Sequence, residues 1–308
     1  IAEIQLNDRL QIQVSASLAM KNPKAPITIY NGKEVYQLSV KKRIGDTIIY
    51  QFPAQDAEWR VAFEKDWSEA RGWWINYNKK VPVRYPIHLH NGILKQPEPA
   101  LNQLNISGKW RVVFNPGTTN DEVLVGVFEQ KIGNFVTGSF LSETGDYRYL
   151  NGHVVGNAIH LQTYTGYWAF VVDATLQSAD QMMGNFYSGA SYNAPFVAYR
   201  DSTVQLRDES SLTYLIKRDE PVVLQELIKM NGRKETIDFS SQKELTLIQI
   251  MGTWCPNCLD ETKLMQALHA EYGSKGLHVV ALAFEVGADT KKQRIRLKQW
   301  IKSMKVNY

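Results

Sequence analysis

The chain contains little cysteine and no long hydrophobic run. Its 308 residues include only two cysteines, Cys255 and Cys258. A structural zinc ion requires four nitrogen or sulfur ligands, and without a second cysteine pair the others would have to be histidines such as His269 or His278. The pair therefore favours redox chemistry over zinc binding, with an inert structural disulfide as a further alternative. No apolar stretch approaches the roughly 18 residues of a membrane-spanning helix, so the sequence predicts no transmembrane segment.

Strong charge of one sign is also absent. The net charge is +4 at pH 7, and the chain is 44% hydrophobic and 21% charged, which is typical of a folded globular protein. The densest basic run, residues 291–302, interleaves lysine and arginine with apolar residues, a pattern typical of the solvated face of a helix. This composition gives no indication of a nucleic-acid partner.

Long helical periodicity is missing before about residue 221, and alternating apolar and polar residues predict strands there instead. Turn-forming pairs such as Asn31-Gly32 and Asn151-Gly152 separate these segments. The first two thirds of the chain are therefore expected to be all-β. The clearest predicted strands are residues 10–14, 27–30, 123–128, 159–161 and 196–199.

One pattern of turn, strand, aromatic strand, glycine-aromatic strand and proline-containing strand occurs twice, about 110 residues apart. The first copy includes Gly72-Trp73-Trp74 and Tyr85-Pro86-Ile87, and the second includes Gly184-Asn185-Phe186 and Ala194-Pro195-Phe196. We interpret the two copies as two related β-units, each a small barrel or sandwich.

The aromatic residues of the β-region could line a ligand groove for sugars or peptides, but most are expected in the core, including Trp59, Trp110 and Trp168. Trp73 and Trp74 point to opposite faces of a strand, so that one of them can be exposed. No Ser/His/Asp order, phosphate loop or carboxylate pair is evident in this region.

Two histidines of the β-region, His88 and His90, lie on one face of a predicted strand, at a spacing that two metal ligands can use. No third ligand is evident near them in the sequence. An ordinary histidine pair is therefore favoured, and we predict no metal site.

The two cysteines lie at the start of a predicted helix. Residues 245–251 form a short apolar segment that predicts a buried strand, and the apolar residues after Cys258 have helical spacing. Acidic residues in the first turn support a helix start at this point. A CxxC motif between a strand and a helix is typical of thiol–disulfide exchange.

The expected helix start also provides a chemical role for each residue of the motif. Unpaired N–H groups and the helix dipole stabilise a thiolate, so Cys255 is the predicted nucleophile. Cys258, one turn further on, is the predicted resolving sulfur. Pro256 suits the first helical position, and Asn257 lies between the sulfurs, where it helps to set the redox potential.

Residues 249–262, with Trp254 before the cysteines and Glu261 after them, resemble the active-site strand, turn and helix of TlpA/ResA-type disulfide reductases. These are thioredoxin-fold proteins of the bacterial envelope, related to the AhpC/TSA peroxiredoxins. Residues 276–285 resemble the next strand of that family. Glu261 matches the acid of the family's WCxxCxxE pattern, or else is a first-turn acid favoured by the helix dipole.

The resemblance implies a dithiol–disulfide oxidoreductase that acts on protein disulfides without a metal or organic cofactor. In it, Cys255 and Cys258 are catalytic, and Trp254, Pro256 and Asn257 support them. The resemblance also implies an upstream membrane thiol donor of electrons and a location in the periplasm or cell envelope.

Three features depart from the family pattern. Thr262 stands where the family commonly has proline, and Gln249 occupies the position of a buried aspartate of thioredoxins. No proline follows Pro256 to supply the cis-proline strand of the fold. Half a thioredoxin domain would leave strand edges unpaired. We therefore expect the natural protein to extend past Tyr308 and to begin after a leader segment that this chain does not include.

The sequence thus predicts a multidomain α+β protein. The expected segments are a β-rich unit at 1–96, a second, repeat-like β-rich unit at 106–201, a linker at 202–220 and a thioredoxin-like domain, truncated at its C-terminus, at 221–308. The favoured function is thiol–disulfide oxidoreductase in the bacterial envelope. The alternatives are a β-rich envelope binding protein with an accessory thioredoxin-like domain, and a thiol peroxidase.

Overall fold

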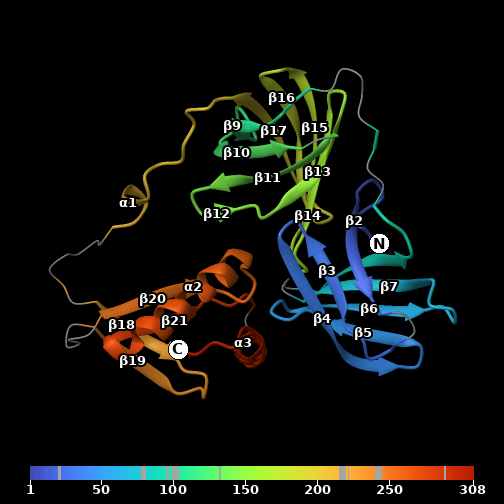
Figure 1. Cartoon of the computed structure of the whole chain (residues 1–308). Helices are drawn as coiled ribbons and strands as arrows, with labels where there is room; N and C mark the ends of the chain where they lie inside the picture. The colour runs from blue at the N-terminus through green and yellow to red at the C-terminus, as the bar shows by residue number, and fades with distance from the viewer. Residues whose placement is uncertain are drawn as a thin grey trace. The chain divides into compact units, whose positions relative to one another are not determined.

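The structure, a computed structural model, consists mainly of β-strands (Figure 1). It describes residues 1–19, 22–77, 81–94, 97–98, 104–131, 133–214, 220, 222–239, 245–287 and 289–308. The chain divides into two compact units, Ile1–Leu206 and Arg207–Tyr308. None of the helices in the described ranges has the length and apolar character needed to cross a bilayer.

The first barrel is formed by strands that pair antiparallel in chain order, with β8 returning to β1 (blue to cyan in Figure 1). Because the ring is closed, it leaves no exposed strand edge. Its strands are β1 (Ala2–Gln5), β2 (Gln11–Leu18), β3 (Ile27–Asn31), β4 (Glu34–Ile44), β5 (Thr47–Gln51), β6 (Ala57–Phe63), β7 (Glu69–Asn76) and β8 (Val83–His90).

The second barrel is a nine-stranded sheet that closes on itself, because β10 pairs with both β9 and β11. Strand β12 is attached to β11 outside the ring, so eight strands form the barrel. The strands are β9 (Gly108–Phe114), β10 (Glu122–Gln130), β11 (Phe135–Ser142), β12 (Gly145–Asp146), β13 (Leu150–Val155), β14 (Ala158–Tyr164), β15 (Ala169–Ser178), β16 (Gln181–Ser188) and β17 (Tyr192–Arg200).

The repeated sequence pattern occupies equivalent positions in the two barrels. Gly72 of β7 pairs with Ile87 of β8, and Gly184 of β16 pairs with Phe196 of β17. A side chain at Gly72 would lie 1.9 Å from the carbonyl oxygen of Arg60, so the neighbouring strand approaches too closely for any other residue. The glycine of the pattern therefore marks a close contact between strands.

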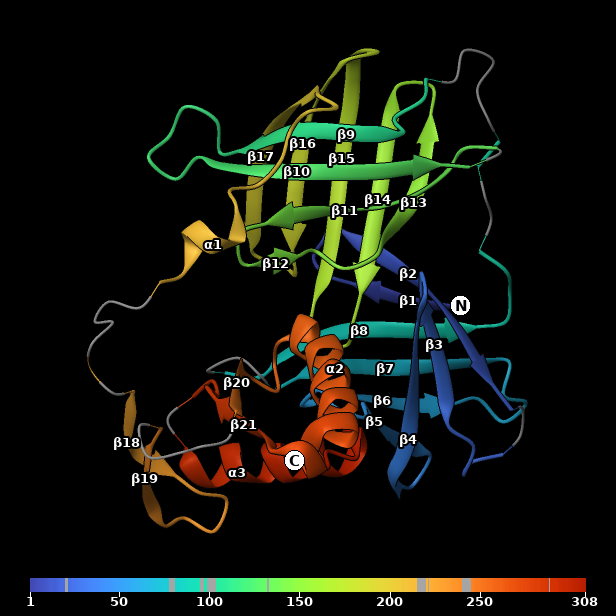
Figure 2. The ribbon, with the colours of Figure 1, turned by 60° about the vertical axis from the view of Figure 1, so that its left-hand side comes forward.

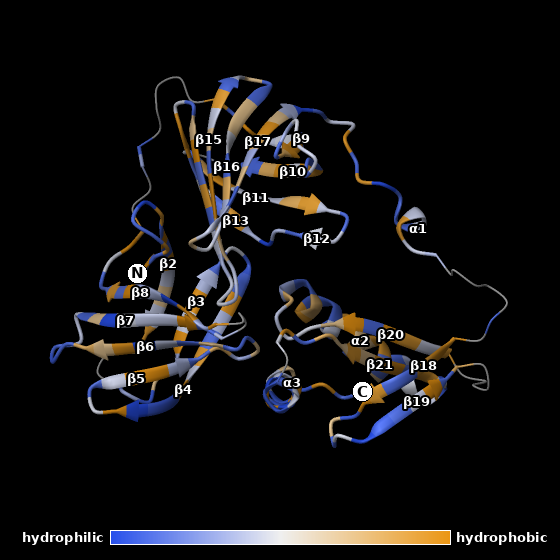
Figure 3. Ribbon diagram, turned by 180° about the vertical axis from the view of Figure 1, so that it is seen from behind, coloured by the Kyte–Doolittle hydropathy of each residue, from blue (hydrophilic) through white to orange (hydrophobic). Residues whose placement is uncertain are grey.

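Side chains fill the interiors of both barrels, as expected for rings of eight strands. Hydrophobic and hydrophilic residues alternate along the strands (Figure 3), so that one set faces inward. Trp74 is 1% exposed and its neighbour Trp73 is 47% exposed, which confirms that the two point to opposite faces. The largest fully buried side chains of the two barrels are Tyr50, Phe52, Trp59, Trp74, Trp110, Phe114, Phe140, Phe186 and Phe196.

The end of β14 and the turn that leads to β15 form hydrogen bonds with the first barrel (Figure 2). The Tyr164 hydroxyl accepts a hydrogen bond from the Trp59 indole N–H at 2.8 Å. The indole N–H of Trp74 donates to the carbonyl oxygen of Gly166 at 3.1 Å. Tyr164 also belongs to the hydrophobic core of the first barrel. Each barrel has its own hydrophobic core, but Tyr164, Ala169 and Val171 of the second barrel pack into the core of the first and so join the two barrels.

Gly166 is constrained in this turn by both conformation and space. Its φ is +79°, and a Cβ would lie 2.3 Å from the ring of Phe52. We expect Gly166→Ala to lower the free energy of unfolding by about 1–3 kcal/mol, measured by urea denaturation. Gly117→Ala is the matched control, since Gly117 has a φ of +75° with no atom within 4 Å of its Cβ position. Equal losses in the two variants would show that the contact with Phe52 does not constrain the turn.

The C-terminal unit contains two separate small sheets in its described residues. Strands β18 and β19 form an antiparallel hairpin, and β20 and β21 form a parallel pair connected through α2. The elements are α1 (Glu209–Leu212), β18 (Val223–Ile228), β19 (Lys234–Asp238), β20 (Leu245–Met251), α2 (Pro256–Tyr272), a 3-10 turn (Gly273–Lys275), β21 (Leu277–Ala283) and α3 (Thr290–Met304).

The predicted β-barrel units are confirmed, and each predicted strand of the β-region coincides with an observed strand. The predicted thioredoxin-like α/β domain is wrong, since the described residues of the C-terminal unit form only two-stranded sheets. The apolar run and the helix cap dictate the local strand, turn and helix, but they do not specify a larger sheet. The segment limits stay a prediction. Pro221, the expected start of the last segment, and linker residues 215–219 lie outside the described residues.

Candidate functional site

The two cysteines form a disulfide bond at the N-terminus of α2. Cys255 is the N-cap residue, and its sulfur accepts a hydrogen bond from the backbone N–H of Cys258 at 3.3 Å. Pro256 is the first residue of the helix. Its lack of a backbone N–H costs no hydrogen bond there, because an N–H at this position has no acceptor within the helix. Cys258 is buried and Cys255 is half-buried. The strand, cap and helix thus bring the sulfurs together at a helix start.

The residues around the disulfide tie α2 to the strand that precedes it. The side chain of Gln249, fully buried in β20, donates hydrogen bonds to Glu261 Oε2 and Thr262 Oγ1, both at 3.1 Å. The Tyr308 hydroxyl donates to Gln249 Oε1 at 2.8 Å. Gln249 and Thr262, which depart from the thioredoxin pattern, therefore form a network that orients the helix.

Trp254 and Asn257 flank the sulfurs and are both half-buried. The Trp254 indole N–H donates to the carbonyl oxygen of Phe284 at 2.8 Å, which fixes the ring beside the end of β21. A disulfide at a helix start suits both an exchange site and an inert structural link. The roles predicted for the cysteines, Trp254, Pro256, Asn257 and Glu261 therefore stay predictions.

A groove of about 910 Å³ lies where the two barrels meet. This volume is within the range of small-molecule binding sites. The first barrel contributes β2, the end of β3 and the turn after β3, and the second contributes β10, β11, β13, β14 and the segment before β13. Side chains fill the interiors of both barrels. A ligand therefore finds a concave surface in the groove between the barrels and not inside either barrel.

Two tyrosine rings at the groove are accessible to a ligand. Tyr30 is 44% exposed and Tyr149 is 39% exposed, although both are large aromatic residues. Tyr149 packs against Gly32, where a Cβ would lie 2.7 Å from the Tyr149 Cβ. The guanidinium carbon of Arg148 lies 5.7 Å from the centre of the Tyr149 ring. Gly32 and Arg148 therefore both contact Tyr149 and hold its ring in place.

Polar contacts between the barrels make the floor of the groove rigid. The backbone N–H of Gln13 donates to Gln162 Oε1 at 3.0 Å. The side chain of Asn31, 4% exposed, donates to Thr163 Oγ1 at 2.9 Å. The guanidinium of Arg148, 6% exposed, pairs with the Glu34 carboxylate. The groove is therefore formed before any ligand arrives.

A separate cluster of ionisable groups in the first barrel is internally satisfied. The carboxylate of Glu58, 2% exposed, accepts hydrogen bonds from Tyr77, Arg60 and Lys41. Burial by itself would raise the pKa of Glu58, but these three donors lower it below the ordinary value. Burial and the hydrogen bond to Glu58 raise the pKa of Tyr77 to about 12. We interpret this cluster as structural.

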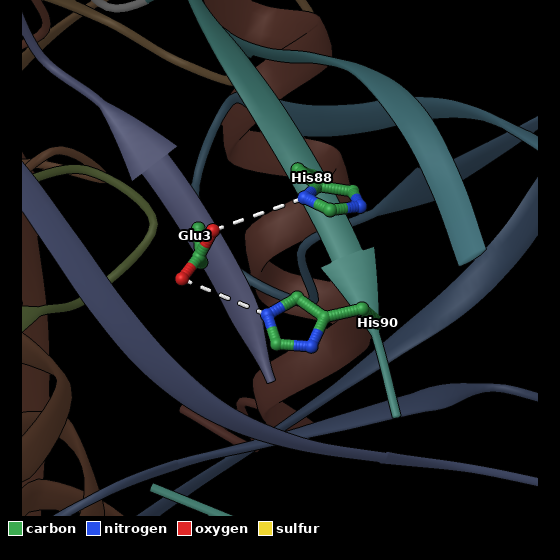
Figure 4. A group of neighbouring side chains, drawn as sticks. All are labelled: Glu3, His88 and His90. Atoms are coloured by element: carbon green, nitrogen blue, oxygen red, sulfur yellow. Dashed lines mark ion pairs between the residues drawn. The ribbon is translucent and has the colours of Figure 1, made fainter. Parts of the chain in front are cut away.

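Three side chains on the outer face of the first barrel form a histidine–carboxylate cluster (Figure 4). Strands β1 and β8 close the barrel and place Glu3 opposite His88. Glu3 Oε2 lies 3.8 Å from His88 Nδ1, and Glu3 Oε1 lies 3.6 Å from His90 Nε2. The sequence indicated the two histidines but not Glu3, because only barrel closure brings strands so distant in sequence together.

Comparisons with known proteins find no matching family model and no matching curated protein. Among solved structures, the chain is similar to a protein of unknown function from the DUF3598 family of Nostoc punctiforme, with 10% identity, a TM-score of 0.21 and coverage of 65% of this chain and 93% of that one. It is also similar to the Burkholderia oklahomensis agglutinin, with 8% identity, a TM-score of 0.15 and coverage of 64% and 93%. At these TM-scores the similarities assign neither a family nor a function.

The expected membership of the TlpA/ResA-type reductases is wrong. No family model supports it, and the described residues of the C-terminal unit form two-stranded sheets and no thioredoxin-like sheet. The resemblance was confined to two short segments, residues 249–262 and 276–285, and two strands, a turn and a capped helix can look alike by chance. The expected protein-disulfide reductase activity, which that resemblance implied, is corrected with it.

The sequence also predicted the absence of a transmembrane segment, two kinds of partner and a location in the cell envelope. The described residues contain no helix suited to span a membrane, in agreement with the expectation. The predicted protein-disulfide substrates and membrane electron donor were implied by the family resemblance alone, and no finding supports them. The envelope location stays a prediction.

Proposed function

We propose that this chain is a β-rich binding protein that holds its ligand in the groove between the two barrels. The observation that carries the proposal is the pair of exposed rings, Tyr30 and Tyr149, beside a floor of fixed polar side chains. Ligand sites commonly combine apolar or aromatic faces with a few well-placed polar groups. The rigid floor lowers the entropic cost of binding, because few protein groups must be ordered.

The chemistry of the groove favours an uncharged ligand rich in hydroxyl groups, such as an oligosaccharide. The side-chain amides of Gln11 and Asn151 can each donate and accept hydrogen bonds, as sugar hydroxyls do. The tyrosine rings offer flat faces that can cover the C–H surface of a sugar ring. Charges of both signs line the groove and select neither anions nor cations: Lys33, Lys131, Glu129 and Asp146.

A glycan array followed by titration calorimetry tests this proposal. We expect Tyr30→Ala and Tyr149→Ala each to weaken binding of the selected glycan about tenfold, which corresponds to about 1.4 kcal/mol. Tyr199→Ala is the matched control, since Tyr199 is 47% exposed on β17 and does not line the groove. An array without any bound glycan would contradict the proposal, as would equal affinities in the three variants.

A further inference from the structure

We propose that Glu3, His88 and His90 form a binding site for a divalent transition-metal ion, with zinc as the favoured ion. Two imidazoles and one carboxylate are a donor set that zinc accepts from proteins, with a fourth position open to water or another ligand. Glu3 points from β1 toward the two rings on the adjacent strand β8 (Figure 4). The site shares no residue with the groove or with the cysteine pair.

The distances between the Glu3 oxygens and the histidine nitrogens are too long for direct hydrogen bonds and are close to the separations between ligands of one metal ion. Direct hydrogen bonds between nitrogen and oxygen measure roughly 2.7–3.2 Å. The Glu3 oxygens lie 3.8 Å and 3.6 Å from the facing nitrogens of His88 and His90. Two ligands held roughly 2.0–2.1 Å from a tetrahedral zinc ion are roughly 3.3–3.5 Å apart. A small closure of the three side chains around an ion would therefore complete the coordination.

The hydrogen bonds on the far sides of the rings orient the two histidines for metal binding. His88 Nε2 lies 2.9 Å from Glu69 Oε2, and His90 Nδ1 lies 3.1 Å from the carbonyl oxygen of Asn91. With those nitrogens as donors, His88 Nδ1 and His90 Nε2 carry free lone pairs that face Glu3. Metal-binding histidines commonly donate their second N–H to a carboxylate or a backbone carbonyl in this way.

The backbone around the cluster is fixed, while the side chains remain accessible. All three residues project from paired strands, and the backbone N–H of His90 donates to the carbonyl oxygen of Ile1 at 3.0 Å. Sites built on strands are held more precisely than sites on loops. The side chains of Glu3, His88 and His90 are 24%, 26% and 27% exposed, so an ion can enter from solvent.

An ordinary histidine–carboxylate pair in the same chain has a different geometry. His160 Nδ1 lies 2.6 Å from Asp173 Oδ1 on the second barrel, at direct hydrogen-bond distance, and both side chains are about half exposed. No third ligating group completes that pair among the described residues, whereas Glu3 completes the cluster on the first barrel. The longer separations at Glu3 are therefore a particular feature of this cluster.

Metal titration of the full chain tests the site. Protein stripped with a chelator, in a Cys255→Ser/Cys258→Ser background that removes thiol ligands, is titrated with Zn²⁺ against a chromogenic chelator and with Co²⁺ by visible absorption. We expect one ion per chain. We expect His88→Ala and His90→Ala to weaken zinc binding more than 100-fold, the isosteric Glu3→Gln at least tenfold, and Glu69→Gln about 10- to 100-fold through the orientation of His88.

His160→Ala is the matched control, since it removes a histidine that already pairs with a carboxylate, and it should leave zinc affinity unchanged. Circular dichroism and the melting temperature of each metal-free variant report whether the barrel is intact. Absence of saturable Zn²⁺ and Co²⁺ binding overturns the proposal. Zinc affinity that is equal in the wild type and in the folded Glu3→Gln variant also overturns it.

Discussion

Replacing Tyr164 with alanine is expected to lower the free energy of unfolding of the N-terminal unit by about 3–5 kcal/mol. The side chain is 3% exposed, and its ring lies in edge-to-face contact with Trp74 and Phe52, at centroid distances of 4.9 and 6.0 Å. Its removal leaves a cavity in the core of the first barrel, into which Tyr164 packs from the second, and it leaves the Trp59 indole N–H without its acceptor. Tyr164 therefore stabilises both the first barrel and the connection to the second.

Urea denaturation of Tyr164→Ala and Tyr164→Phe separates packing from hydrogen bonding. The phenylalanine variant keeps the ring and loses only the acceptor for Trp59, so we expect a smaller loss of about 1–3 kcal/mol. Tyr199→Ala, at an exposed tyrosine, should change stability by less than about 0.5 kcal/mol. A loss below about 1 kcal/mol in Tyr164→Ala would show that Tyr164 does not stabilise the core of the first barrel.

Arg148→Met is expected to destabilise the same unit by about 3–5 kcal/mol, because it leaves the partly buried carboxylate of Glu34 without its countercharge. Arg148 is 6% exposed and Glu34 is 13% exposed, and the two side chains pair across the boundary between the barrels. Asn31 also donates to the Glu34 carboxylate, at 3.0 Å, but as a neutral donor it cannot neutralise the charge. The loss of stability in Arg148→Met is therefore expected to come mainly from the charge of Glu34, which is left without a countercharge.

The double variant Arg148→Met/Glu34→Gln tests that explanation directly. We expect it to be more stable than Arg148→Met, because the neutral amide removes the unpaired charge of Glu34. Lys234→Met is a control at an exposed pair, since Lys234 and Glu226 are 69% and 74% exposed, and it should cost less than about 1 kcal/mol. If the double variant were less stable than the single one, the charge of Glu34 would not be the cause.

The barrels could be predicted from the sequence because their signals are local. Alternation with a period of two fixes the inward face of each strand, as Trp73 and Trp74 show. The repeated glycine, at Gly72 and Gly184, marks the same close approach of strands in each barrel. These features depend on neighbouring residues along one strand or across one hairpin.

The features that create the candidate sites could not be predicted, because they depend on contacts between distant residues. Barrel closure places Glu3 opposite His88, and packing of the barrels places Asn31 against Thr163. Neither contact has a counterpart in local periodicity. The CxxC segment shows the opposite error: its strand, cap and helix formed as predicted, but a correct local structure did not imply the larger fold or its activity.

The central claim is that ligand binding belongs to the groove and not to the cysteine pair. One calorimetric comparison of the full chain tests it most directly: the affinity for the array-selected glycan in the wild type, in Tyr149→Ala and in Cys255→Ser/Cys258→Ser. We predict an unchanged affinity in the cysteine variant and a loss of about tenfold in Tyr149→Ala. A loss in the cysteine variant together with full affinity in Tyr149→Ala would contradict the claim.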